Sequence, residues 1–249
     1  MIEELRQRLQ ALQKTAKIDA DPGALPLGIA SVDATLGGGL AHGALHEISA
    51  PAEAHFAAAT GFALGLASLP SLRARQGNNR LWIAEDMALN ESGVPYGPGL
   101  DAFKLAPERL VTAAVSHRRD LLWAMEEALR CRALGAVIGE VRGGAIDPVA
   151  VRRLSLAAAE GGTLALLLRA QPANDASTAA TRWIVGAAPS SPSYGPGAPR
   201  FAAQLIRNRR GPLGSWILEW RDTDERFILA THAQPVAAPL LNRPRQKVA

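Results

Sequence analysis

The chain has 249 residues, of which 48% are hydrophobic, so it can bury a core as one large domain or two small ones. It contains a single cysteine, Cys131, and shows neither a cationic leader with an apolar stretch nor an apolar run near the length of a membrane span. These features exclude a disulfide scaffold and a membrane helix and favour a cytoplasmic location. The net charge of +4 comes mainly from arginine, which suits phosphate contacts.

The first 20 residues are expected to form a separate segment. Between residues 2 and 17, apolar side chains recur at helical spacing, which predicts an amphipathic helix; they are Ile2, Leu5, Leu9, Leu12 and Ala16. The turn-forming residues 19–23 then end the pattern. The apolar stripe can pack either on the chain's own domain or on another subunit or partner.

Residues 44–63 have the outline of a phosphate-binding loop without its chemistry. A buried strand ending at Ile48, a tight connection and an Ala-rich helix from Phe56 give the element order of a P-loop. The motif G-x-x-x-x-G-K-[ST], however, would place Ala50 and His55 at the glycines, Phe56 at the lysine and Ala57 at the hydroxyl. We therefore predict no bound nucleotide or other cofactor; an ordinary strand, turn and helix is the alternative interpretation.

Strands and helices alternate in the pattern that follows, which predicts a parallel sheet covered on both faces. From Thr181 onward successive strands predict an antiparallel extension. The expected strands span residues 80–85, 109–115, 134–141 and 163–169, then 181–187, 200–207 and 215–221, and the expected helices span 118–132 and 147–160. In the first of these helices, Ser116 is the expected N-cap and Trp123 is interpreted as a core residue. In the second, Asp147 before Pro148 is the expected N-cap, and the helix is expected to end at Gly161 and Gly162.

Two of these strands end in a carboxylate, Glu85 and Glu140. A hydrophobic strand that ends in an acid, as residues 134–141 do, has the form of a Walker B strand. Without a phosphate loop, neither acid can complete a metal or catalytic site. We therefore predict no catalytic residue and no metal, and we interpret Glu85 as a structural carboxylate at a strand end.

Residues 27–47, LGIASVDATLGGGLAHGALHE, resemble the segment that leads into the phosphate loop of RecA-family recombinases. The matching positions are Ser31, Asp33, Gly37 to Gly39, Gly43 and Glu47. Residues 204–220, QLIRNRRGPLGSWILEW, resemble the basic strand, turn and strand of the same proteins, with Arg207, Asn208 and Arg209 in the basic run. The resemblance implies a RecA-like three-layer α/β fold over residues 21–221, with a degenerate P-loop. It also places Glu85 where recombinases carry the carboxylate that activates water.

Two loops that follow predicted strands differ from the recombinase pattern. The recombinase loops that hold single-stranded DNA correspond here to residues 142–146 and 170–177, which are short and lack basic and aromatic residues in a stacking pattern. We therefore expect strand exchange to be lost.

A closer resemblance rests on the missing phosphate loop together with four stretches of sequence. They are LWAMEEALRCRALGAVIGEV, RRLSLAAAEGGTLALLLR, AATRWIV and RNRRGPLGSWILEW. Together they resemble the ImuA family, especially its alphaproteobacterial type. The resemblance implies a non-catalytic accessory role in SOS-induced, error-prone translesion DNA synthesis. The implied partners are the inactive Y-family polymerase ImuB, an error-prone C-family polymerase reached indirectly, and RecA as a further candidate. A SulA-like cell-division inhibitor and a RecA-like DNA-dependent ATPase are the alternatives.

Two regions are candidates for partner or DNA contacts. The densest basic cluster is Arg207, Asn208, Arg209 and Arg210, which can equally be a solvated turn. The second is residues 222–249, expected to be a flexible tail, with Leu240, Leu241, Arg243 and Arg245 as its candidate contacts. The sequence leaves open whether DNA is touched at all.

Overall fold

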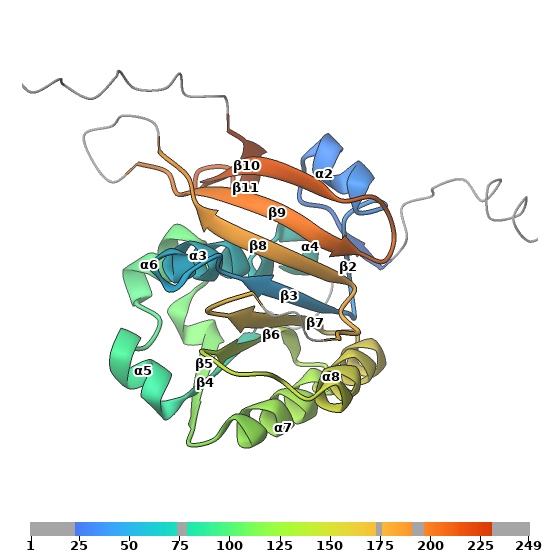
Figure 1. Cartoon of the computed structure of the whole chain (residues 1–249). Coiled ribbons are helices and arrows are strands. Elements are labelled where there is room, and N and C mark those ends of the chain that lie inside the picture. The colour runs from blue at the N-terminus through green and yellow to red at the C-terminus, as the bar shows by residue number, and fades with distance from the viewer. Residues whose placement is uncertain (1–22, 74–78, 173–175, 191–196, 231–249) are drawn as a thin grey trace, which may run out of the picture.

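The computed structural model describes residues 23–230 except 74–78, 173–175 and 191–196. Its centre is a nine-stranded sheet in the order β11-β10-β9-β8-β3-β7-β6-β4-β5 (Figure 1). The strands are β3 (Leu45–Ser49), β4 (Asn79–Glu85), β5 (Leu110–Val115), β6 (Leu134–Val141), β7 (Leu164–Arg169), β8 (Thr181–Ala187), β9 (Arg200–Asn208), β10 (Gly214–Arg221) and β11 (Arg226–Leu229). A separate small sheet pairs β1 (Ala24–Leu25) with β2 (Leu40–Ala41).

Strands β3 to β8 are parallel, and β9, β10 and β11 add to them in antiparallel register. The predicted parallel sheet with an antiparallel extension is therefore present. The change of direction comes one strand later than expected, because β8 pairs in parallel with β3 and antiparallel with β9.

Helices cover both faces of the parallel half of the sheet. One face packs on α3 (Phe56–Ala67), and the other packs on α7 (Arg118–Leu129) and α8 (Pro148–Gly161), which lie side by side (Figure 1). The shorter elements are α2 (Ala30–Thr35), η1 (Glu53–His55), α4 (Pro70–Arg73), α5 (Asp86–Ser92), α6 (Gly97–Ala102) and η2 (Pro107–Arg109). None of the helices in the described part of the chain is long and apolar enough to cross a membrane.

The sequence of α3 explains its central position. Nine of its 12 residues are buried, so the helix is apolar on nearly all sides, as an Ala-rich helix inside a core must be. The ring of Phe62 lies 5.5 Å from that of Trp183 and 5.3 Å from that of Phe227. Gly65 lies so close to the Phe227 ring that an added Cβ would be 2.4 Å from it. These contacts fix the antiparallel strands on α3.

Three sequence-based expectations need correction. Trp123 is not a core residue: it is 61% exposed on the outer side of α7. Ser116 does not cap α7, because His117 takes the N-cap position and the Ser116 hydroxyl donates to Asp86. The ordered sheet also extends past residue 222, where the flexible tail was expected to begin, because β11 pairs with β10. The expected helix over residues 1–20 lies outside the described residues.

The other predicted cap is confirmed. The Asp147 side chain accepts from the backbone N–H of Val149 at the start of α8, and Gly162 ends the helix in the left-handed conformation with φ 65°.

A fully buried histidine joins β3 to β8 and β2. The Nε2 of His46 lies 2.8 Å from the carbonyl oxygen of Ala41, which can only accept, so Nε2 carries the proton. Thr181 then donates to Nδ1 over 2.7 Å and accepts from the indole N–H of Trp183. The neutral imidazole satisfies this chain of hydrogen bonds, and burial lowers the pKa of His46 to about 4.

Replacement of Gly65 by alanine tests the packing of β11 on α3. The added methyl group would collide with the Phe227 ring, so Gly65→Ala should lower the free energy of unfolding by about 1–3 kcal/mol. The control is Gly99→Ala in α6, where an added Cβ meets nothing within 4 Å. Urea denaturation should show the control unchanged or slightly stabilised; equal effects of the two substitutions would contradict the packing.

Acid should weaken the fold through His46. The pKa of His46 in the folded state lies below its ordinary value of 6.5. The unfolded state therefore binds more protons as pH falls from 6.5 towards 4, and stability is lost in that window. The loss should reach about 2–3 kcal/mol by roughly pH 4.5. Urea denaturation of the unmodified chain and His46→Gln should show their stability difference shrinking by that amount on acidification. A difference independent of pH would show that His46 is not buried as a neutral group.

Candidate functional site: a phosphate loop closed by protein side chains

The predicted strand, loop and helix are present at the carboxyl edge of the parallel strands. Strand β3 ends at Ser49, residues 50–55 form the connection with the short helix η1, and α3 begins at Phe56. In an open parallel sheet this edge is where ligands bind. The predicted element order of a P-loop is therefore present. The side chains in the loop determine which ligand it can bind.

Three of the four motif positions have contacts within the fold. Ala50 is buried, and its N–H donates to the carbonyl oxygen of Arg169 over 3.0 Å. The Nδ1 of His55 accepts from the N–H of Ala187 over 3.1 Å. Phe56 is 7% exposed and belongs to the core around α3, while Ala57 is exposed. None of these side chains supplies the ammonium or the hydroxyl that a triphosphate with magnesium requires.

An arginine just after β6, the next strand but one in the sheet, lies over the start of α3. The guanidinium carbon of Arg142 lies 3.9 Å from the centroid of the Phe56 ring. Its Nε donates to Glu140 Oε1 over 2.6 Å, and its Nη2 donates to the Ser92 hydroxyl over 2.6 Å. The space above the residue at the lysine position is thus occupied by a cation of the protein itself.

Glu140, the acid at the end of β6, is fully engaged in the same network. It is 4% exposed, and while Oε1 accepts from Arg142, Oε2 accepts from the indole N–H of Trp82 over 3.1 Å. A carboxylate with both oxygens in such contacts serves as an internal counter-ion for the arginine. In the described part of the chain, no three His, Cys, Asp or Glu side chains are grouped in a way that could hold a metal ion.

Glu85 has a looser environment. Its side chain is 20% exposed, and its ion-pair partner Arg118 is 4.0 Å away. It lies at the N-cap of α5 and makes no capping hydrogen bond through its side chain. A distant ion pair at the end of a strand fits the structural role expected for this residue.

Two of the residues that carry the recombinase resemblance hold the fold together. The carboxylate of Asp33 accepts from the backbone N–H groups of Leu27, Gly28 and Ile29, which shapes the entry into α2, and burial raises the pKa of this carboxyl. Glu47 is buried on β3, where it pairs with Arg182 over 2.8 Å. The resemblance in these positions therefore reflects architecture.

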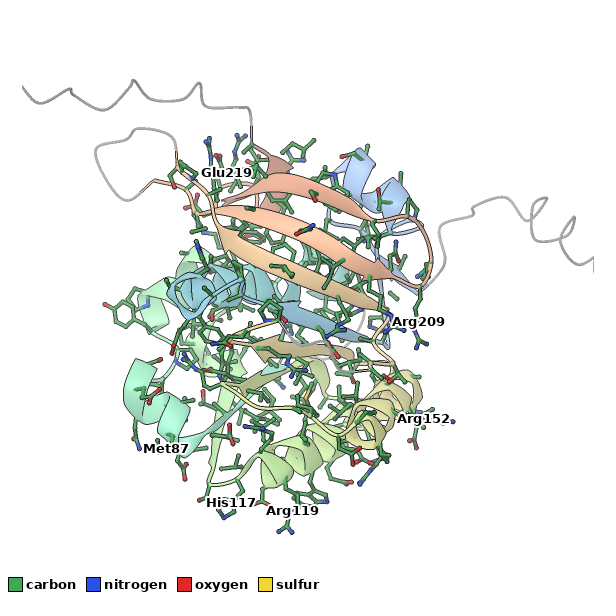
Figure 2. The ribbon with its side chains drawn as sticks, viewed as in Figure 1. Met87, His117, Arg119, Arg152, Arg209 and Glu219 are labelled. Carbon is green, nitrogen blue, oxygen red and sulfur yellow. The ribbon has the colours of Figure 1, made fainter. Side chains whose placement is uncertain are left out.

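The predicted basic cluster lies together at the hairpin between β9 and β10. Asn208 donates to the carbonyl oxygens of Thr35 and Pro212, and it accepts from the N–H of Arg210. Arg210 also donates to the carbonyl oxygen of Gly37 over 3.2 Å. These two residues attach the hairpin to α2, whereas Arg209 is exposed and points away from the fold (Figure 2). Arg207 is half-buried at the end of β9.

The other candidate contacts, Leu240, Leu241, Arg243 and Arg245, lie outside the described residues. Two features of the site were not foreseen from the sequence: Arg142 over Phe56, and a cavity of about 580 Å³ beside them. The sequence around a loop arginine does not indicate which residues it contacts in the fold. The pattern around Trp82 predicted only a buried strand.

Substitution of Glu140 separates an internal counter-ion from a metal ligand. If the carboxylate neutralises Arg142, Glu140→Gln should lower the free energy of unfolding by about 2–3 kcal/mol. If Glu140 were instead a metal ligand, its replacement by glutamine would leave the free energy of unfolding unchanged or raise it. The matched control is Glu85→Gln, which should cost less than about 1 kcal/mol because its ion pair is long. Urea denaturation followed by tryptophan fluorescence measures both, and a stable Glu140→Gln variant would contradict the network.

Comparisons with known proteins agree with this description. No protein-family model matches the chain. The curated relatives include Protein ImuA from two strains of Caulobacter vibrioides, NA1000 / CB15N and ATCC 19089 / CIP 103742 / CB 15. Each is 29% identical to this chain, and each alignment covers 78% of this chain and 82% of the relative.

Among solved structures, the RadB recombinase superposes with a TM-score of 0.54 at 15% identity, and it covers 82% of this chain and 98% of its own. At this identity the match speaks for the fold alone, and the predicted RecA-like architecture is confirmed. The chain therefore has a RecA-like fold and is similar in sequence to Protein ImuA, as its motifs predicted.

Proposed function

We propose that this chain is a non-catalytic accessory protein of damage-induced, error-prone translesion DNA synthesis. The observation that carries the proposal is the closed phosphate loop: a recombinase-like sheet and loop are kept, while Arg142 covers Phe56 and pairs with Glu140. Homology to Protein ImuA supports the assignment to DNA-damage mutagenesis. A fold retained without its catalytic groups is suited to work through contacts with other macromolecules.

The proposed partners follow from the ImuA resemblance. The chain acts as an adaptor that binds an ImuB-type inactive Y-family polymerase directly and an error-prone C-family polymerase through it, in the cytoplasm and under SOS control. RecA is a further partner, because a protomer-like fold offers the surface complementarity to meet the end of a recombinase filament. The exposed Arg209 at the hairpin is a contact for an acidic partner or for DNA.

The ATPase alternative conflicts with the electrostatics of the loop. A triphosphate needs hydrogen-bond donors and a positive charge at the position of the P-loop lysine. Phe56, which stands at that position, supplies neither. The nearest cation, Arg142, already neutralises Glu140, and to draw it to a phosphate would leave a buried carboxylate unpaired at a cost of about 3–5 kcal/mol.

Co-purification tests the adaptor proposal. The tagged full-length chain, expressed with the ImuB-type protein of the same organism and treated with nuclease, should retain that protein. Reversal of the hairpin charge in Arg209→Glu should reduce the retained partner about tenfold, because rim charges tune association.

The matched control is Arg119→Glu on α7, whose side chain is 91% exposed at a distant site, and it should have no effect. Loss of ImuB only after nuclease treatment would show a DNA-mediated association. No retention in any form would overturn the adaptor role.

A further inference from the structure

A largely apolar cavity lies beside the loop. It has a volume of about 580 Å³ and lies between α3 and the segment that carries α5 and α6. Most of its wall is aromatic or aliphatic, and the Arg142 and Glu140 pair forms part of it. The main apolar lining residues are Phe56, Leu64, Trp82, Tyr96, Leu100 and Phe103. Cavities of this size and composition are typical of binding sites.

The apolar character continues outside the cavity. Val94 and Tyr96, which line it, are 64% and 73% exposed, and Met87 on α5 is 71% exposed and points outward (Figure 2). Three large apolar side chains exposed within ten residues are unusual for a solvated surface and mark an interaction site.

Acidic side chains predominate around the cavity. Residues 85–104 contain four carboxylates, Glu85, Asp86, Glu91 and Asp101, and one lysine, Lys104. Glu53 on η1 lines the opposite side. Glu91 and Asp101 are exposed next to the lining residues Ser92 and Leu100. An occupant should therefore combine apolar side chains for the cavity with positive charges for its rim.

The chain's own C-terminal segment has this chemistry. Residues 231–249 contain Leu240 and Leu241, followed by Arg243, Arg245 and Lys247, and no acidic residue. The N-terminal residues 1–22 fit less well, because their four basic residues are balanced by four acidic ones.

The segment also starts close enough to reach the cavity. The described chain ends at Ala230, three residues after Phe227. The ring of Phe227 lies 5.1 Å from that of Trp220, which lies 5.4 Å from Phe103 in the cavity wall. The indole of Trp220 also donates to the carbonyl oxygen of Ala102 in α6. Ten residues from Ala230 to Leu240 can span about 33 Å, well beyond what two ring contacts require.

We propose that residues 231–249 dock in cis on this cavity, with Leu240 and Leu241 inside it and Arg243, Arg245 and Lys247 on its acidic rim. This docking covers the exposed surface of Val94 and Tyr96, and it is independent of the proposed function. A tethered segment has a high effective concentration, so modest affinity is sufficient.

Disulfide trapping in the full-length chain tests the docking. In a Cys131→Ser background, Val94→Cys combined with Leu241→Cys should form an intramolecular disulfide about ten times faster than Leu156→Cys combined with Leu241→Cys. Leu156 is the matched control: it is 60% exposed, and it lies on α8 across the sheet. Mass spectrometry and non-reducing gels distinguish disulfides within a chain from those between chains.

Charge provides the second arm of the test. Reversal of Arg243, Arg245 and Lys247 to glutamate should slow the Val94 and Leu241 pair to the control rate, and added salt should slow it as well. Equal rates for the two cysteine pairs, or rates insensitive to charge reversal, would overturn the proposal. Disulfides formed only between chains would show that the segment docks on a second copy, which also contradicts docking in cis.

Discussion

The contact between Arg142, Phe56 and Glu140 is the interaction on which the rest of the site depends. A phosphate loop requires positive charge and N–H donors directed at empty space, whereas here the guanidinium lies 3.9 Å from an aromatic ring and donates to a buried carboxylate. Trp82 completes the network through its indole N–H. The side chains of Arg142, Glu140 and Trp82 thus satisfy one another, which favours a stable fold over a reactive site.

Other residues that carry the recombinase resemblance also have contacts within the fold. Asp33 still shapes the entry into α2, and Glu47 is still buried in an ion pair with Arg182. Both positions carry the recombinase resemblance, and both act within the fold without any bound ligand. The antiparallel strands are held in turn by the aromatic contacts of Phe62 with Trp183 and Phe227. A shared framework therefore explains the likeness to RadB at 15% identity.

Much of the fold could be predicted because local patterns decide it. The buried strand of residues 134–141, the Asp147 cap and the strand, loop and helix around Phe56 all follow from hydrophobic periodicity and capping chemistry. Tertiary contacts decide the rest. Trp123 lies beside the apolar stripe of α7, and only the position of the neighbouring helix determines that it faces solvent. The contacts of Arg142 could not be predicted, because its partners lie in α3, in α5 and in the strand before it. The burial of His46 likewise depends on a distant residue, since its hydrogen-bond partner Thr181 is 135 residues away.

Calorimetric titration of the full-length chain with ATP and magnesium tests the closed loop most directly. The account predicts no heat of binding at nucleotide concentrations up to roughly 1 mM, because Phe56 stands at the position of the P-loop lysine and Arg142 is already paired with Glu140. Saturable binding at micromolar concentration, with a triphosphate located beside Phe56 in the resulting complex, would contradict it.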